Sequence, residues 1–173
     1  MHETTGDSEI LAAVRDRDVA ALGELYARHA DAVYTLAYRI LGVAQEAEDV
    51  LQDVFVGLPR ALAGYREHGR FAAWLRRVTV RAALMRRRST DRKREAPLEH
   101  AAIAAQPSDS PLDRIALERA LGRLPDPLRR VFVLKEIEGY SHAEVGALLG
   151  ISAANSSMRL SRAWSALRRE IHS

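Results

Sequence analysis

The chain has 173 residues, 47% of them hydrophobic, which is enough for one ordinary domain or two small ones and excludes a disordered protein. It contains no cysteine, which excludes disulfide scaffolds, thiolate zinc sites and cysteine nucleophiles. Charged residues interrupt every apolar stretch before 18 residues, and the acidic start is unlike a secretion signal, so we expect a cytoplasmic protein without membrane insertion.

The basic charge forms one block. The net charge is only +3, but residues 66–94 hold 11 basic and 2 acidic side chains, whereas residues 1–65 hold 5 basic and 11 acidic ones. The basic block also contains Phe71 and Trp74. Such a surface suits nucleic acid, because Arg and Lys neutralise backbone phosphates and release counterions. A merely solvated arginine-rich helix face is the alternative.

The first half of the chain predicts a series of helices, because apolar residues recur at three- and four-residue spacing. A short helix is expected over residues 9–15. Asp18 can cap a long second helix that ends at Gly42. A third helix begins near Gln45, and Pro59 should kink or end it, because proline lacks the amide hydrogen.

A polar loop over residues 64–69 precedes the next helix, expected from about Arg70 to Arg88. Phe71 and Trp74 match its inward stripe, so we assign both mainly to the core, while its arginines point outward. The sequence over residues 89–110 lacks a sustained apolar stripe and ends in a Ser- and Pro-rich cluster. We therefore predict a flexible linker there.

A second helical module follows the linker. Ser110 and Pro111 can cap and open a helix, with acidic Asp113 at its third position. Asp126 as cap and a proline after it predict another helix, which stops at Gly139. The predicted fold is therefore all-α, with two small helical domains.

Independent helix-end signals agree near the C-terminus. Ser141 and Glu144 form a capping box, Gly150 suits the left-handed end of a helix, and Ser152 can cap the next one, which is basic. Two short helices joined by a three-residue turn are typical of a helix-turn-helix that enters the major groove. A helix corner without a DNA role is the alternative.

Nothing in the sequence indicates an enzyme or a cofactor. The third helix carries an acidic group, Glu46, Glu48, Asp49 and Asp53, but a hard-metal site needs oxygens that converge from several elements. Acidic residues also favour a helix start in any protein. The six histidines lack ligand spacing, and no phosphate loop or nucleophile motif is present.

These segments together resemble an extracytoplasmic-function (ECF) sigma factor of the major bacterial sigma family. Residues 47–55 (AEDVLQDVF) are similar to the family's polymerase-binding helix, and residues 69–75 (GRFAAWL) to its promoter-melting segment. Leu124-Pro125, then EGYS at 138–141 and LGIS at 149–152, follow the order of the fourth sigma domain.

The resemblance implies a second sigma domain over residues 1–88, a linker over 89–110 and a fourth sigma domain over 111–173. Core polymerase docking would involve Glu48, Asp49, Gln52, Asp53 and Phe55. Binding of the minus-ten promoter element would involve Tyr65, Arg66, His68, Arg70, Arg77 and Arg81. Binding of the minus-thirty-five element would involve Ser152, Asn155, Ser157, Arg159 and Arg162.

The implied partners are the beta-prime and beta subunits of core RNA polymerase, promoter DNA and an anti-sigma factor, with no cofactor. The chain departs from the family pattern at Pro59, at Arg81 in place of a frequent asparagine, and at residues 155–157 (Asn-Ser-Ser) in place of a Thr-Val-basic triplet. We expect Ser156 to place a hydroxyl on the inward face and loosen the helix. Ser157 replaces a basic residue and so removes a phosphate contact, from which we predict weak or unusual minus-thirty-five recognition.

Two other functions are compatible with the residues. A conventional helix-turn-helix regulator would bind duplex DNA by itself, with the N-terminal module serving dimerisation or sensing. An interaction protein, such as a sigma-like decoy, would engage polymerase without using a promoter. Only a sigma factor gives promoter-specific starts with core polymerase.

Overall fold

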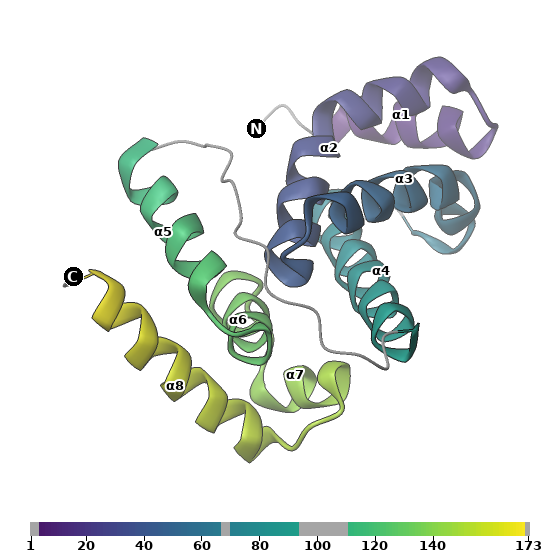
Figure 1. Cartoon of the computed structure of the whole chain (residues 1–173). Coiled ribbons are helices and arrows are strands. Elements are labelled where there is room, and N and C mark those ends of the chain that lie inside the picture. The colour runs from purple at the N-terminus through teal and green to yellow at the C-terminus, as the bar shows by residue number, and fades with distance from the viewer. Residues whose placement is uncertain (1–3, 67–69, 94–110, 172–173) are drawn as a thin grey trace. The chain divides into compact units, whose positions relative to one another are not determined.

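The computed structural model describes residues 4–66, 70–93 and 111–171, and every regular element in these ranges is helical (Figure 1). The chain divides into two compact units. One comprises Met1–Tyr38 and Gln45–Arg87, and the other comprises Arg39–Ala44 and Arg88–Ser173. The predicted all-α class with two helical modules is confirmed, and most of the predicted linker, residues 94–110, lies outside the described residues.

The N-terminal half contains α1 (Thr4–Arg15), α2 (Val19–Leu41), α3 (Ala44–Ala61), the 3-10 turn η1 (Leu62–Gly64) and α4 (Phe71–Lys93). Asp18 caps α2 as predicted, because its Oδ1 accepts hydrogen bonds from the amides of Ala20 and Ala21 at 2.8 and 3.1 Å. Gly42 follows the last residue of α2 with φ of +74°, a conformation that side chains with a Cβ rarely adopt.

Three helix boundaries differ from the sequence prediction. α1 begins at Thr4 rather than near residue 9. α3 continues past Pro59 and ends two residues later, at Ala61. The chain then tightens into η1. α4 reaches Lys93 rather than Arg88, because residues 89–93 contain neither Gly nor Pro to end it.

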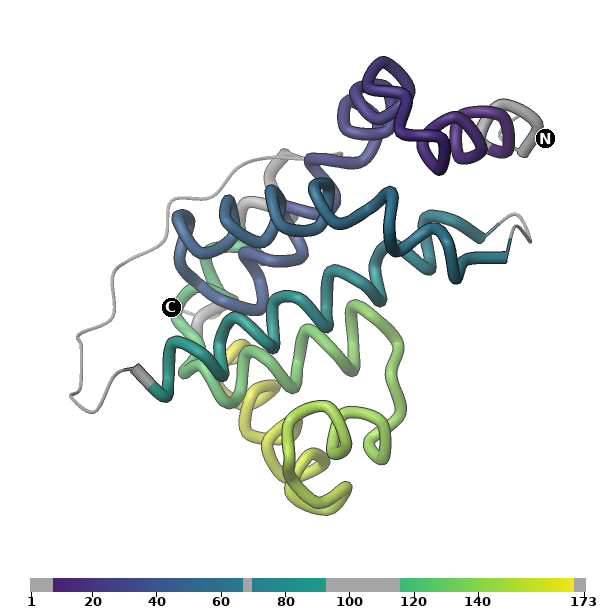
Figure 2. Tube along the Cα trace, turned by 90° about the vertical axis from the view of Figure 1, so that its right-hand side faces the viewer, coloured from purple at the N-terminus to yellow at the C-terminus, as the bar shows by residue number. Residues whose placement is uncertain are grey.

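Aromatic contacts hold the helices of the N-terminal unit together. Tyr26 of α2 meets Phe55 of α3 edge-on with ring centroids 4.9 Å apart, and His29 of α2 meets Phe71 of α4 at 5.2 Å. Leu11 anchors α1 and is completely buried. The helices α2, α3 and α4 are neighbours in both views (Figures 1 and 2). This core fixes α3 and α4, whose outer faces remain in solvent.

The C-terminal half contains α5 (Pro111–Arg123), α6 (Asp126–Phe132), the π-helical turn η2 (Val133–Ile137), α7 (His142–Leu149) and α8 (Ala153–Ile171). α5 begins at Pro111 as predicted, whereas its expected cap, Ser110, lies outside the described residues. Gly139 has φ of +77° just after η2, where the sequence predicts the helix to stop.

The predicted cap of α6 is wrong by one residue. Pro125 occupies the cap position and makes no side-chain cap hydrogen bond, while Asp126 lies in the first turn. The Asp126 carboxylate instead accepts a hydrogen bond from Nη2 of Arg129 at 2.7 Å. A guanidinium one turn away is therefore a partner of Asp126.

The helix-turn-helix forms as the sequence predicts. Ser141 Oγ accepts from the Glu144 amide at 3.2 Å, and Glu144 Oε2 accepts from the Ser141 amide at 2.7 Å. Gly150 has φ of +68°, and Ser152 Oγ accepts from the amide of Asn155 at 3.0 Å. Figure 2 shows α7 and α8 joined by a short turn in the yellow-green part of the trace.

The inner face of α8 packs on α5 and α6. Ala163 and Leu167 are buried, with Leu160 beside them. They meet Leu121 of α5 and Phe132 of α6 in one apolar cluster. The packing holds α8 along its length and leaves its opposite face exposed.

Candidate nucleic-acid interfaces

A pocket of about 290 Å³ opens beside the first turns of α4. One wall comes from the chain after η1 and the other from α4, and the lining residues are Gly64, Tyr65, Arg66, Arg70, Ala73, Trp74 and Arg77. The Tyr65 and Trp74 rings lie 4.9 Å apart at 44°, so the pocket has an aromatic side. Arginine side chains surround that aromatic side.

The pocket unites most of the residues that we predicted for the minus-ten element. Arg66, Arg70 and Arg77 all line it and are exposed. Arg81 is exposed one turn beyond Arg77 on α4, a spacing that places it on the same side of the helix. His68 lies outside the described residues.

The aromatic residues at the pocket beside α4 have more than one role. Tyr65 is 8% exposed, so its ring is part of the wall rather than a free surface. Phe71 is 3% exposed and belongs to the core, as predicted. Trp74 is half-buried and lines the pocket, so a core assignment describes only part of it.

The outer face of α3 is acidic and polar. Glu48, Gln52 and Asp53 are exposed there, as expected of a docking surface. Phe55 is 5% exposed and packs on Tyr26, so the structure places this predicted polymerase-binding side chain in the core.

Two features of this face were not predicted. Asp49 forms an ion pair with Arg86 of α4, and both side chains are about one-third exposed. Val56 is 82% exposed, three residues after Asp53 and four after Gln52, so an apolar side chain continues the same stripe. The helical periodicity of the sequence could have revealed this feature, because it places the apolar Val56 on an otherwise polar face of α3.

Glu48 also affects a neighbouring tyrosine. Partial burial raises the pKa of Tyr34 on α2, and the negative charge of Glu48 raises it further. The Tyr34 ring stacks on Tyr38 with centroids 5.9 Å apart. The acidic stripe of α3 therefore begins beside an aromatic pair.

The residues predicted to read duplex DNA lie on α8 and at its start, on two different sides. Asn155, Arg159 and Arg162 are three or four residues apart and share one edge, with Ser152 at the cap. Ser157 is exposed but falls about 200° around the helix from Asn155. No single edge of α8 therefore presents the whole predicted set.

Asn155 does not present its full amide to solvent. Its Oδ1 is buried and has no hydrogen-bond partner within the described ranges. An adenine edge needs both the donor and the acceptor of an asparagine. Reading adenine would therefore require the Asn155 side chain to turn outward.

The buried serine of α8 is not left without a partner. Ser156 is fully buried, as the sequence predicts, and its Oγ lies 3.0 Å from Nδ1 of His142 at the start of α7. A satisfied hydroxyl offsets much of its burial cost. The contact links the two helices of the motif, which is opposite to the loosening that we predicted.

Gly146 is a further residue that the sequence analysis missed. A Cβ at this position in α7 would lie 2.6 Å from the carbonyl oxygen of Ile151 in the turn. The turn can approach α7 so closely only because residue 146 is glycine. A glycine inside an eight-residue helix is the sequence signal that could have found it.

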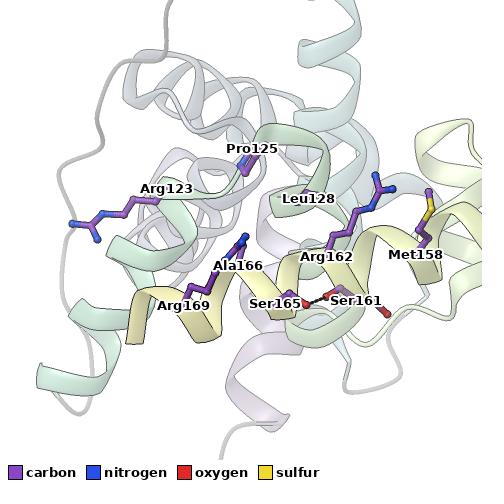
Figure 3. Close-up of a pocket in the computed structure, with 9 residues that line it drawn as sticks. All are labelled: Arg123, Pro125, Leu128, Met158, Ser161, Arg162, Ser165, Ala166 and Arg169. Carbon is purple, nitrogen blue, oxygen red and sulfur yellow. Dashed lines mark hydrogen bonds between the residues drawn. The ribbon is translucent and has the colours of Figure 1, made fainter. Parts of the chain in front are cut away.

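A groove of about 780 Å³ runs beside α8 in the C-terminal unit (Figure 3). Its apolar lining comes from Pro125, Leu128, Met158 and Ala166, and its other lining residues are Arg123, Ser161, Arg162, Ser165 and Arg169. No acidic side chain lines it. Arg162 therefore belongs both to the predicted DNA-reading edge and to this groove.

Within residues 4–66, 70–93 and 111–171, no group of three or more His, Asp or Glu side chains is arranged to hold a metal ion. The helices in those ranges are also too short or too polar to cross a bilayer.

Comparison with known proteins places both units in one family. Residues 25–93 match Sigma-70 region 2, and residues 114–167 match Sigma-70, region 4. The ECF RNA polymerase sigma factor SigM of Mycobacterium tuberculosis is 33% identical over 168 residues, which cover 97% of this chain and 85% of SigM.

Two solved structures have a similar fold. CnrH, in complex with the cytosolic domain of CnrY, is 26% identical with a TM-score of 0.52, and the match covers 94% of this chain and 95% of CnrH. The sigma factor RpoE of Bartonella quintana, in complex with the anti-sigma factor NepR, is 20% identical with a TM-score of 0.59, and the match covers 89% and 98%.

Proposed function

The chain belongs to the extracytoplasmic-function sigma factors, which direct bacterial RNA polymerase to specific promoters, and we propose how its two units divide that work. The N-terminal unit docks on core polymerase through α3 and captures the melted minus-ten strand beside α4. The helix-turn-helix reads the duplex minus-thirty-five element. The chain acts in the cytoplasm and has no catalytic activity of its own, because the polymerase performs the chemistry.

The pocket beside α4 is the observation that carries this proposal. A cavity with an aromatic side can hold one unstacked base, since stacking on aromatic rings is worth about 1–3 kcal/mol per base. Arg66, Arg70 and Arg77 provide positive charge for the adjoining phosphates. A pocket that takes a flipped base stabilises melted DNA and does nothing for duplex DNA, so it favours promoter opening.

The α3 face supports docking on the polymerase. Its exposed stripe of Gln52, Asp53 and Val56 combines negative charge with an apolar side chain, which suits a basic partner surface with an apolar patch. Asp49 contributes through a carboxylate that Arg86 holds in place. We assign this face to the beta-prime subunit, and the helix-turn-helix unit to the beta subunit.

A template with a mismatched, already melted minus-ten region tests the pocket assignment. On the natural duplex promoter, Arg66→Ala with Arg77→Ala should reduce initiation strongly, because the captured strand offsets the cost of melting. On the mismatched template the defect should shrink, since melting no longer has to be driven. Arg162→Ala, which affects duplex reading, should show the same defect on both templates. An equal defect of the pocket variant on both templates would contradict the assignment.

We further infer that an anti-sigma protein controls this chain by covering the groove beside α8. RpoE of Bartonella quintana is found in complex with the anti-sigma factor NepR, and CnrH in complex with the cytosolic domain of CnrY. Apolar lining with Arg123, Arg162 and Arg169, and no acidic residue, suits an amphipathic helix with acidic flanks. Because Arg162 lies on the DNA-reading edge too, a helix in the groove would also cover that contact.

Inhibition of transcription is the readout for the anti-sigma proposal. A protein that copurifies with the chain should suppress promoter-specific transcription when it is added to the reconstituted reaction. Arg123→Glu with Arg169→Glu should relieve that suppression, because like charges then face each other, while uninhibited transcription stays close to wild type. Full suppression of the variant would place the anti-sigma contact elsewhere.

A further inference from the structure

We propose that Arg15, at the end of α1, is a positioning residue for the pocket beside α4, which we assigned to the melted minus-ten strand and call the minus-ten pocket. This inference rests on the proposed function of that pocket. Arg15 lies 47 and 50 residues before the carbonyl groups that it contacts, so neither its position in the sequence nor the pocket lining indicates the role.

Arg15 holds the chain at the point where it enters the pocket wall. Its Nε donates a hydrogen bond to the carbonyl oxygen of Leu62 at 3.2 Å, and its Nη2 donates to that of Tyr65 at 2.8 Å. Tyr65 contributes to the pocket wall, and Arg66 follows it directly. One guanidinium thus bridges both ends of the 3-10 turn η1.

The two walls of the pocket are stabilised differently. Arg70, Trp74 and Arg77 lie at the start of α4 or within it, where helical hydrogen bonds fix the backbone. The opposite wall leaves the helical part of the chain at Tyr65, whose φ and ψ are −81° and 129°. That wall depends on contacts from elsewhere in the unit.

Several contacts fix Tyr65, including the Phe71 ring, whose centroid lies 6.0 Å from that of Tyr65. The Tyr65 amide donates to the Leu62 carbonyl at 3.1 Å, its ring packs 4.9 Å from Trp74, and its carbonyl accepts from Arg15. The hydrogen bond from the Tyr65 amide keeps the turn closed, and the ring contact keeps the side chain in the wall. The Arg15 bond acts on the carbonyl group of Tyr65, from which the backbone continues toward Arg66.

α1 is anchored well enough to serve as a support. Leu11 and Val14 are completely buried in the unit's core, and Val14 directly precedes Arg15. Charge-assisted hydrogen bonds are also stronger than those between neutral groups. Because both its Nε and its Nη2 point to carbonyl oxygens, we assign Arg15 to the pocket wall rather than to a DNA phosphate.

The test uses holoenzyme reconstituted from full-length chain and core polymerase, on a promoter that the wild-type chain opens. Permanganate reactivity of melted thymines measures opening, and filter binding over a salt series measures the closed complex. Arg15→Ala should lower the equilibrium constant for promoter opening about tenfold, comparable with the loss of one charge-assisted hydrogen bond. Closed-complex affinity and its salt slope should stay within twofold of wild type.

Two variants exclude a general effect of charge or stability. Arg28→Ala removes the same charge from α2, where Arg28 pairs with Glu24 on its own helix, and should leave opening unchanged. Arg15→Lys keeps a charged donor and should restore part of the opening. In thermal unfolding followed by circular dichroism, the midpoint of Arg15→Ala should fall by only a few degrees, as expected from one lost charge-assisted hydrogen bond, and that of Arg28→Ala should stay close to wild type, so both variants remain folded in the assays.

A spectroscopic readout isolates the pocket itself. In a Trp164→Phe background Trp74 is the only tryptophan, and its fluorescence reports the wall that Tyr65 shares with it. Arg15→Ala should increase acrylamide quenching of Trp74, and Arg15→Lys should reverse part of the increase. This measurement requires no promoter, so it remains decisive if the chain proves not to initiate transcription.

Two results would overturn the inference. Unchanged opening together with unchanged quenching would mean that Arg15 does not support the wall. A loss of closed-complex affinity with a shallower salt slope would mean that Arg15 contacts DNA directly. Failure of the wild-type chain to open any promoter would instead contradict the proposed function.

Discussion

The two helices to which we assign DNA contacts, α4 and α8, differ in how they present basic charge. Beside α4, three exposed arginines converge on a pocket with aromatic walls, and Arg81 lies one turn further along. On α8 the predicted contacts fall on two sides of the helix, and the side of Ser157 offers no charged residue from the predicted set. The predicted DNA contacts therefore gather at one pocket in the N-terminal unit and lie on separate sides of one helix in the C-terminal unit.

This difference teaches that a well-formed motif and a strong binding surface are separate properties. The helix-turn-helix has its capping box, its left-handed Gly150 and a buried contact between Ser156 and His142. These features position α8 accurately, but they add no positive charge to the face that would meet DNA. We therefore expect α4 to contribute more to promoter use than α8 does.

Reversing a charge on the α3 face should have the largest effect, because it affects the only contact that we assign to the polymerase in this unit. Asp53→Arg should weaken core polymerase binding by several kcal/mol, since like charges would then oppose each other. It is a cleaner variant than Asp49→Arg, which would also break the ion pair with Arg86. A fluorescence titration with labelled core polymerase measures it.

Asp31→Arg is the matched control, because Asp31 is exposed on α2 and its substitution makes the same change in charge. It should leave polymerase affinity close to wild type. If Asp53→Arg and Asp31→Arg weaken binding equally, the loss reflects overall charge and α3 is not the docking surface.

A methyl group at Gly146 should damage the helix-turn-helix without touching its DNA face. Gly146→Ala should cost about 1–3 kcal/mol, since the new Cβ would lie 2.6 Å from the Ile151 carbonyl oxygen and the turn must shift. Amide hydrogen exchange of α7 and α8 in the full chain measures the loss. Binding to duplex promoter DNA should fall with it.

Gly23→Ala provides the comparison in the other unit. Gly23 lies inside α2, and nothing would lie within 4 Å of its added Cβ. The substitution should stabilise its helix by up to about 1 kcal/mol, because alanine is the better helix former. The assigned role of Gly146 is wrong if its substitution also stabilises.

A comparison of two substitutions, one on each side of α8, determines which side of this helix meets DNA. Ser157→Arg should steepen the salt dependence of duplex binding by about one unit if that side faces phosphates. Arg162→Ala should reduce the slope by about one unit if the opposite edge does. Ala116→Arg, at an exposed position of α5, controls for added charge away from α8.

The two sides give opposite outcomes in this experiment. A change in the salt slope with Ser157→Arg alone would place the DNA-reading face on the side of Ser157, away from Asn155 and Arg159. A change with Arg162→Ala alone would keep it there. No change with either variant would mean that α8 does not grip duplex DNA, and the difference between the two units would then be larger than we propose.

The smallest expected effect concerns Tyr34 beside the α3 face. Burial and then Glu48 raise the pKa of its phenol. The neutral phenol is therefore favoured in the folded chain, so this contribution to stability is present below the ordinary tyrosine pKa of about 10 and is lost as pH rises toward the folded-state value. Glu48→Gln should lower the Tyr34 pKa in an ultraviolet titration, with Tyr34→Phe identifying its signal.

Local rules predicted the helix ends well. Asp18, Ser141, Glu144, Gly150 and Ser152 act on amides or backbone angles within a few residues, so the sequence around each contains nearly all the information that is needed. Pro59 and Asp126 were predicted less well, because the first lies close to a helix end and the second has a competing guanidinium partner.

Contacts between distant segments were the part that the sequence could not provide. Asp49 meets Arg86 across 37 residues, and Arg15 meets Tyr65 across 50. The arginines of α4 were recognisable as a basic block, but the pocket that they surround depends on how η1 packs against that helix. Periodicity indicates which face is buried, and only the fold shows what lies opposite it.

Reconstituted transcription tests the central claim most directly. Bacterial core polymerase, the purified chain and genomic DNA fragments are incubated with nucleotides, and the RNA 5′ ends are mapped. We predict discrete starts that require the chain and share one promoter sequence. A chain that binds duplex DNA by itself but gives no new starts would be a conventional regulator. One that binds core polymerase without new starts would be a decoy, and either result would contradict the account.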